Sequence, residues 1–90
     1  MIKIEYSQDA PEDIVRLALF LLKVSPASAN DLFDVIEDGI LILIRHPNVG
    51  RLVTESGLCE LVISHGKSAY IALYKFDELT QAVLIAAIKH

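Results

Sequence analysis

The side chains that could do chemistry in this chain lie in its second half. Arg51 follows a glycine, Tyr74 ends an apolar segment, and His90 is the last residue. Cleaving RNA without a metal requires a base for the 2′-hydroxyl, an acid for the leaving oxygen and a cation for the phosphate charge. These three residues are of the right types, but no spacing rule links them. A solvated arginine, a strand tyrosine and a frayed terminal histidine are the simpler interpretation of the same residues.

The sequence offers no other familiar site. His46, His65 and His90 are widely separated, and Cys59 is the only cysteine, so we expect no metal centre and no internal disulfide. There is no glycine-rich phosphate loop and no nucleophile elbow. We therefore expect no cofactor. The single cysteine fits a reducing cytoplasm.

Composition indicates one small domain with a large apolar fraction for a core of its size. Its 90 residues predict one domain over 1–90, yet 53% of them are apolar and the mean hydropathy is +0.47. Small monomers rarely leave large apolar patches bare, so this excess indicates either a rich core or a surface that awaits a partner, a homodimer included. The longest apolar run near mid-chain, residues 40–44, is far below the roughly 20 residues that span a bilayer, so no membrane partner is expected.

The net charge of −4 is unevenly distributed. Residues 1–44 carry eight acids and three bases, whereas residues 45–90 carry four acids, five bases and all three histidines. The second half is therefore the better candidate to meet an anionic partner, although its small positive charge is not by itself a nucleic-acid footprint.

The N-terminal part predicts a strand and then a helix. Residues 2–6 alternate apolar and polar side chains, as a half-buried strand does. Asp9 is the expected N-cap of a helix that runs to about Lys23. Glu12 and Asp13 are expected to form a solvated helix start that suits the helix dipole. The predicted apolar stripe of this helix consists of Ile14, Leu17, Ala18, Leu21 and Leu22.

A second, longer helix follows after a short break. Ser25 and Pro26 form a good start signal, and the proline that follows His46 ends the helix there. Gly39 weakens the middle of this helix but allows close packing. The predicted apolar stripe consists of Ala29, Leu32, Phe33, Ile36, Ile40, Leu43 and Ile44.

The remaining sequence predicts a three-stranded antiparallel meander. Apolar segments near 58–64, 69–75 and 82–89 are separated by turn residues, and Gly66 is free to adopt positive φ in the first turn. The N-terminal strand should complete the sheet, and both helices should cover one face. The predicted class is α+β.

The order of these motifs resembles the RelE/ParE family of bacterial toxins. The motifs are the His46-Pro47…Gly50-Arg51 link, the Glu60-Leu61-Val62-Ile63 strand, the Tyr70-Ile71-Ala72-Leu73-Tyr74 strand and the closing Ile88-Lys89-His90. The resemblance implies a cytoplasmic toxin that a cognate antitoxin holds inactive by wrapping its apolar grooves. The residues that it suggests for contact with target or antitoxin are Arg51, Cys59, Lys67, Tyr74, Lys89 and His90.

The family has two branches that imply different chemistry. RelE-like members cleave mRNA on the ribosome, and here such a nuclease would use Arg51, Tyr74 and His90. ParE-like members poison DNA gyrase by binding, with no known need for those residues. The segment from Gly57 to Ile63, followed by the segment from Tyr70 to Tyr74, resembles the ParE-like or plasmid-stabilisation toxins more than the RelE-like ones. We therefore expect a gyrase-binding toxin, with no catalytic residue favoured.

Departures from the family pattern keep a third alternative open. The family usually carries arginine at the position of Cys59, its members are usually basic, and many continue past the position of His90 with a basic tail. Each departure removes positive charge that would engage a target. The chain could therefore be an attenuated domain that still binds an antitoxin.

Overall fold

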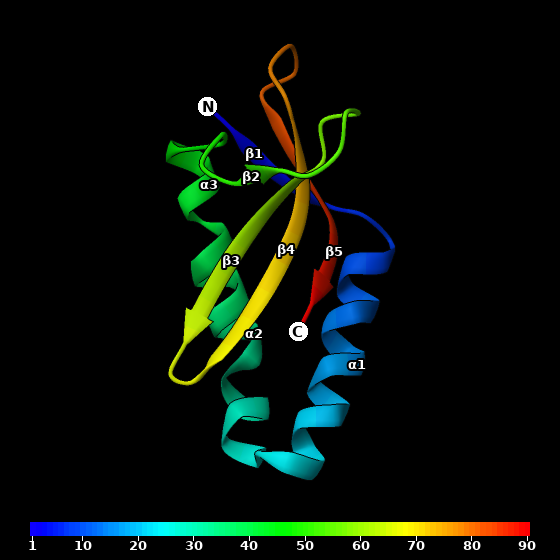
Figure 1. Cartoon of the computed structure of the whole chain (residues 1–90), viewed down its shortest axis with the longest axis vertical. Helices are drawn as coiled ribbons and strands as arrows, with labels where there is room; N and C mark the ends of the chain where they lie inside the picture. Colours follow the sequence, from blue (N-terminus) through cyan, green and yellow to red (C-terminus); the bar gives the residue numbers. More distant parts are fainter.

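Two layers form the fold of residues 1–90 in the computed structural model: a five-stranded sheet and a helical hairpin that covers one of its faces (Figure 1). The predicted α+β class is confirmed. The elements in chain order are β1 (Lys3–Tyr6), α1 (Asp9–Val24), α2 (Pro26–Ile40), α3 (Ile42–Arg45), β2 (Arg51–Leu52), β3 (Cys59–His65), β4 (Ser68–Asp77) and β5 (Ala82–Lys89).

The sheet has the strand order β1-β5-β4-β3-β2. As expected, β3, β4 and β5 form an antiparallel meander, and Gly66 has a φ of 61° in the turn between β3 and β4. The N-terminal strand completes the sheet by running parallel to β5, with Lys3 opposite Ala82 and Tyr6 opposite Ile85. The sequence did not predict β2, because two exposed residues are too few to show an alternating pattern.

The helical hairpin differs from expectation at two of its ends. Asp9 is the first residue of α1 rather than its N-cap; the Ser7 hydroxyl instead accepts the Ala10 N–H, with an N–O distance of 3.3 Å. The long second helix is divided, because α2 ends at Ile40 and the short α3 follows. At the break the Ile44 N–H bonds to the carbonyl of Leu41, three residues earlier, which tightens the turn.

The start of α2 and its contact with the sheet are as predicted. Ser25 is the N-cap and Pro26 the first helical residue. Gly39 brings the helix close to β3: a Cβ atom there would lie 2.6 Å from Cγ2 of Ile63. A side chain larger than hydrogen would therefore push α2 away from the sheet.

The core lies between the hairpin and the covered face of the sheet. The buried side chains are Ala10, Ile14, Leu17, Leu21, Ala29, Leu32, Ile36, Ile40, Leu43, Ile63, Tyr70, Ala72, Tyr74, Val83, Ile85 and Ile88. Four residues of the predicted stripes are not among them: Ala18 and Ile44 are half-buried, Leu22 is 52% exposed and Phe33 is 56% exposed. The two exposed residues lie at the margins of their stripes, where the helix surface turns from the sheet towards solvent.

Polar side chains of the N-terminal region tie α1 to β5. The register of β4 with β5 shifts next to Tyr74, and there the Ser7 hydroxyl donates to the carbonyl of Ala86 at 2.8 Å. The carboxylate of Asp13 accepts the N–H of Ile88 at 3.0 Å. Asp13 is therefore half-buried and structural, so its predicted role in a solvated helix start is wrong; the expectation holds for the exposed Glu12.

Candidate functional site

A glycine and a buried tyrosine position the loop that carries Arg51. The N–H of Gly50 donates to the hydroxyl of Tyr74, with an N–O distance of 2.9 Å. A Cβ atom on Gly50 would lie 2.6 Å from the Tyr74 hydroxyl oxygen and 2.8 Å from the carbonyl oxygen of Glu60. Only glycine fits so close to these two oxygen atoms. Their contact with Gly50 positions the backbone that enters the two-residue strand β2.

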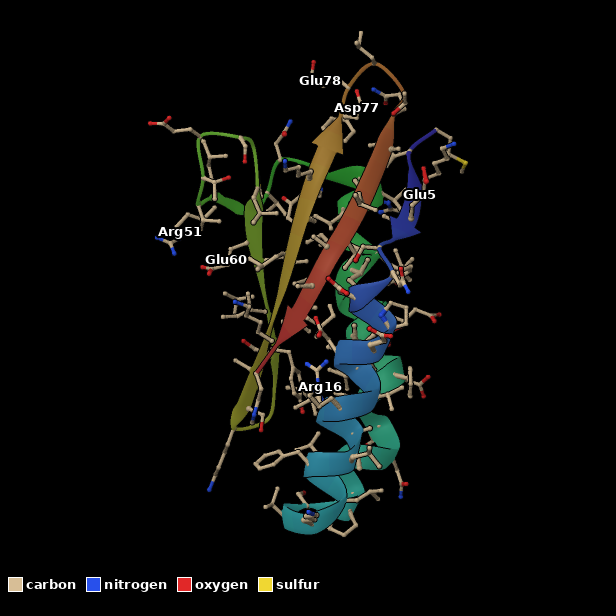
Figure 2. The ribbon with its side chains drawn as sticks, turned by 90° about the vertical axis from the view of Figure 1, so that its right-hand side faces the viewer. Glu5, Arg16, Arg51, Glu60, Asp77 and Glu78 are labelled. Atoms are coloured by element: carbon tan, nitrogen blue, oxygen red, sulfur yellow. The ribbon has the colours of Figure 1, made fainter.

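Arg51 lies on the face of the sheet away from the helices and forms an ion pair there. It is opposite Glu60 in the β2–β3 register, and its Nη2 is 3.0 Å from Oε1 of Glu60. Figure 2 shows the two side chains together on the side of the sheet opposite α1. The Arg51 side chain is 74% exposed, so it remains reachable by a partner that competes with or extends this pair.

Tyr74 has no exposed surface and therefore presents no ring for a base to stack on. Burial raises the pKa of its hydroxyl above the ordinary value of 10.0; the Gly50 hydrogen bond acts in the opposite direction, and Cys59 adds to the rise. The tyrosine is a packing and loop-anchoring residue, which is the simpler of the two interpretations that its sequence position allowed.

Cys59 lies between Tyr74 and β2. It is opposite Tyr74 on β4 and opposite Leu52 on β2, and it packs partly buried against the core. Its Sγ is 3.7 Å from the carbonyl oxygen of Gly57, so the thiol makes one weak polar contact. Arg51, Cys59 and Tyr74 thus share one end of the sheet, although they point to different faces.

His90 and Lys89 lie towards the other end of the sheet. The His90 ring stacks on Tyr70 with a centroid distance of 5.3 Å, and the Phe20 ring of α1 is 6.2 Å away. Tyr70 and Tyr74 are four residues apart on β4, which corresponds to about 13 Å along a strand. The structure therefore does not bring His90 together with Tyr74 and Arg51.

Lys67 is separate from both groups. It lies beside Gly66 in the exposed turn that joins β3 to β4. The six candidate residues consequently form no single pocket, and no group of three or more His, Cys, Asp or Glu side chains is placed to hold a metal ion. This geometry suits contacts spread over a surface better than it suits a catalytic centre.

The most continuous candidate surface is one that the sequence reasoning did not identify. Val15, Leu19 and Leu22 of α1 follow helical spacing, and all three are more than half exposed. A second apolar stripe at positions i, i+4 and i+7, beside the core stripe, is the signal that could have identified it. Neighbouring exposed apolar side chains on the hairpin are Phe20, Val24 and Phe33.

The open face of the sheet adds a second apolar area. Val62 on β3 and Leu84 on β5 are both exposed there, because no helix covers that face. In Figure 2 the strands β3 and β4 (yellow-green to gold) lie to the left of α1 and α2. None of the helices is both long enough and apolar enough to cross a membrane.

Comparison of the whole fold with solved structures finds matches that include two toxin–antitoxin structures. The chromosomal ParDE system from P. aeruginosa gives a TM-score of 0.81 at 15% identity, covering 100% of this chain and 96% of that chain. The intact E. coli RelBE toxin–antitoxin complex gives 0.63 at 9% identity, covering 99% and 95%. At such identities the likeness concerns the fold. No curated protein matches the sequence.

A family model gives the sequence-level assignment. The model of the ParE toxin of the type II toxin–antitoxin system parDE matches residues 4–90, which include every element of the structure from the second residue of β1 onward. The predicted RelE/ParE resemblance is thereby confirmed, and the chain belongs to the ParE toxin family of type II toxin–antitoxin systems.

Proposed function

We propose that this ParE-family toxin inhibits DNA gyrase by binding it in the cytoplasm, and that a cognate antitoxin neutralises it. The proposal that the chain acts by binding rests on one observation: the three candidate nuclease residues lie apart in the structure. Arg51 is paired with Glu60, Tyr74 is fully buried, and His90 lies against Tyr70. Proton transfer requires groups within hydrogen-bond reach of one scissile site, and these side chains do not surround one.

Binding to gyrase needs no such assembly. A protein interface draws its energy from a few well-packed anchors spread over a surface. Arg51 is an exposed cation beside the open face of the sheet, and arginine is a frequent anchor in interfaces. The exposed apolar side chains of that face, Val62 and Leu84, lie on neighbouring parts of the same surface.

The apolar stripe of α1 supports an antitoxin partner. Val15, Leu19 and Leu22 present a helix face that nothing in the chain covers. Burying such side chains is favourable by about 25 cal/mol per Å² of apolar surface removed from water. A ligand that binds only the folded chain also raises its stability. We therefore expect a cognate antitoxin to raise the melting temperature of the chain.

Two assays test the function together. Purified chain is added to gyrase in a supercoiling assay, and RNA from cells that express the chain is mapped for new 5′ ends. The expected result is loss of supercoiling without new mRNA cuts, and reversal on addition of the antitoxin. Cuts that depend on the ribosome, with supercoiling intact, would contradict the proposal.

An attenuated antitoxin-binding domain is the second candidate, and Cys59 favours it. This residue stands where the family usually has arginine, and it makes only a weak thiol contact. Loss of a charged anchor weakens target binding without disturbing the antitoxin surface on α1. A chain that binds antitoxin but leaves both gyrase and mRNA unaffected would favour this candidate.

A further inference from the structure

The N-terminal strand β1 forms one edge of the sheet. It pairs with β5 on one side, and no strand lies beyond it. Figure 2 shows β1 beside β5 at the outer margin of the sheet, with Glu5 at the same end of the sheet as Asp77 and Glu78. An edge strand presents unpaired backbone N–H and C=O groups with which another strand can pair.

The hydrogen bonds to β5 determine which backbone groups of β1 face outward. The N–H of Lys3 donates to the carbonyl of Gln81, with an N–O distance of 3.0 Å. In a parallel pair of strands, alternate residues direct both of their backbone groups to the same neighbour. Lys3 and Glu5 therefore pair with β5, whereas Ile4 and Tyr6 direct their N–H and C=O groups away from the sheet.

The side chains of β1 alternate between the two faces of the sheet. Lys3 and Glu5 lie on the open face, because Glu5 is opposite the exposed Leu84 of β5. Ile4 is opposite the buried Val83 and packs against the core on the helix side. The edge therefore carries one cation and one anion on the open face and apolar side chains on the helix face.

These two alternations leave three antiparallel registers between two copies of β1. An antiparallel ladder places outward-facing residues opposite one another, so Ile4 can lie opposite Ile2, Ile4 or Tyr6 of a second copy. The first register places Lys3 opposite Lys3, and the third places Glu5 opposite Glu5. Like charges directly opposite one another are destabilising, whereas opposite charges are favourable. Only the central register places each Lys3 opposite Glu5 of the other copy.

The central register has a two-fold axis at Ile4, so both copies use the same surface. The two Ile4 residues exchange backbone hydrogen bonds, and Ile2 of each copy is opposite Tyr6 of the other. Lys3 and Glu5 then form the non-hydrogen-bonded pairs, in which side chains approach most closely. Within one chain their charged atoms are 3.8 Å apart and both side chains are more than half exposed, so this weak contact leaves them available.

The open face beside β1 has an excess of acids that a second Lys3 would reduce. A hollow of about 490 Å³ there is lined by Glu5, Asp77 and Glu78 and by a single base, Lys75. The central register brings Lys3 of the second copy to the Glu5 margin of this hollow. The charge of this surface therefore favours a second copy of the chain over an acidic partner.

We propose that β1 is a dimerisation edge, at which two copies of the chain join their sheets in antiparallel fashion about a two-fold axis at Ile4. The contact is small, and interfaces below about 1,200 Å² belong to weak, transient complexes. We therefore expect a dimer that forms at high protein concentration and dissociates on dilution. The edge and its charges are independent of the function proposed above.

Sedimentation velocity of the intact chain over a wide concentration range measures the association, and NMR hydrogen exchange on the same samples reports on individual amides. We expect a monomer–dimer equilibrium in which exchange of the Ile4 and Tyr6 amides slows as concentration rises. The Lys3 and Glu5 amides, which already bond to β5, should change little. A chain that stays monomeric at every concentration, or that forms open-ended assemblies, would overturn the proposal.

Charge reversal tests the register. Lys3→Glu and Glu5→Lys each place like charges opposite one another, and each should weaken dimerisation roughly tenfold. The two substitutions in one chain restore the opposite pairs and should return the affinity to within about twofold of the parent's. An equimolar mixture of the two single variants should form mixed dimers, because every pair across the axis then joins a lysine to a glutamate. Native mass spectrometry detects these mixed dimers.

Matched controls reverse exposed charges elsewhere, with Lys23→Glu on α1 and Glu55→Lys in the loop before β3. Both should dimerise within about twofold of the parent. Circular dichroism checks that each variant is folded, and a mixed dimer shows directly that neither single variant has lost the edge. Single β1 variants that dimerise like the parent, folded single variants that do not combine with each other, or controls that weaken the dimer equally would each contradict the β1 edge.

Discussion

The Gly50 N–H and the Tyr74 hydroxyl, 2.9 Å apart, join the loop before β2 to the core of the sheet. The tyrosine is fully buried, and the glycine has no room for a side chain. Tyr74, which its residue type made a candidate for catalysis, therefore determines where Arg51 is placed. It acts through the fold and not through contact with a partner.

Tyr74→Phe should destabilise the chain by about 1–2 kcal/mol, because it leaves the half-buried Gly50 N–H without its acceptor. Urea unfolding followed by circular dichroism measures the loss. The matched control is Tyr6→Phe, whose ring is exposed at the end of β1 and should change stability little. Toxicity per folded molecule should be retained, so a variant that is stable but inactive would contradict the structural role.

Stability should also decline at alkaline pH through the same tyrosine. Burial raises the pKa of Tyr74 above 10.0 in the folded chain, so the unfolded chain loses this proton at lower pH. The stabilising contribution of the neutral phenol is fully present below the unfolded pKa and is lost as pH rises through the folded one. Above about pH 10, the free energy of unfolding should fall more steeply for the parent than for Tyr74→Phe. Tyr6, whose pKa burial also raises, contributes equally to both proteins.

The fold could be predicted from the sequence because its elements follow strong local signals. The meander follows alternating apolar segments, and the start of α2 follows the Ser25-Pro26 signal. The break at Leu41 and the strand β2 escaped prediction for a physical reason. The break is one tightened turn inside a continuous apolar run, and β2 has only two residues, so local periodicity records neither. Asp13 was misassigned because its partner Ile88 is 75 residues away in the sequence.

The candidate site was less predictable than the fold. Residue type identified Arg51 as an accessible cation, but residue type could not show that Tyr74 is buried or that His90 stacks on Tyr70. The distance between sites on one sheet depends on strand register, which the sequence gives only approximately. The spacing of Val15, Leu19 and Leu22 carries the second apolar stripe of α1, but the stripe predicted for this helix includes only Leu22 of the three.

Cys59→Arg should leave the fold intact and increase growth inhibition. The cysteine is half-buried near the sheet end, so a longer side chain can place its stem along β2 and its charged head in water. It would supply the cation that the family resemblance implies at this position, beside the Arg51 end of the sheet. Growth curves at matched expression measure the effect, with Cys59→Ser as the uncharged control. A folded arginine variant that is no more toxic than the parent would contradict the attenuation hypothesis.

Arg51→Ala should reduce growth inhibition more than it reduces stability. The ion pair with Glu60 is exposed, and pairs of this kind contribute only about 0.2–1 kcal/mol to folding. Glu60→Gln removes the same pair while keeping the cation, so it should match Arg51→Ala in stability but retain toxicity. Thermal unfolding and gyrase inhibition, measured on both variants, separate the two contributions. Equal loss of inhibition in both variants would show that the pair, and not the free cation, is what the target requires.

His90→Ala gives the sharpest separation of the two branches of the superfamily. In a nuclease, losing the proton-transfer group should slow cleavage by roughly 10²–10⁴-fold. In the structure, His90 stacks on Tyr70 and is distant from Arg51 and Tyr74, so its loss removes one aromatic contact worth about 0.5–1.5 kcal/mol. We therefore expect a slightly less stable chain that keeps most of its toxicity and produces no mRNA cuts.

The control variant His90→Phe retains the stacking and removes the imidazole group that could transfer a proton, so it should restore the lost stability with toxicity unchanged. Codon-phased cleavage that disappears in both variants would instead require His90 to act on RNA, and the nuclease would replace the gyrase-binding toxin.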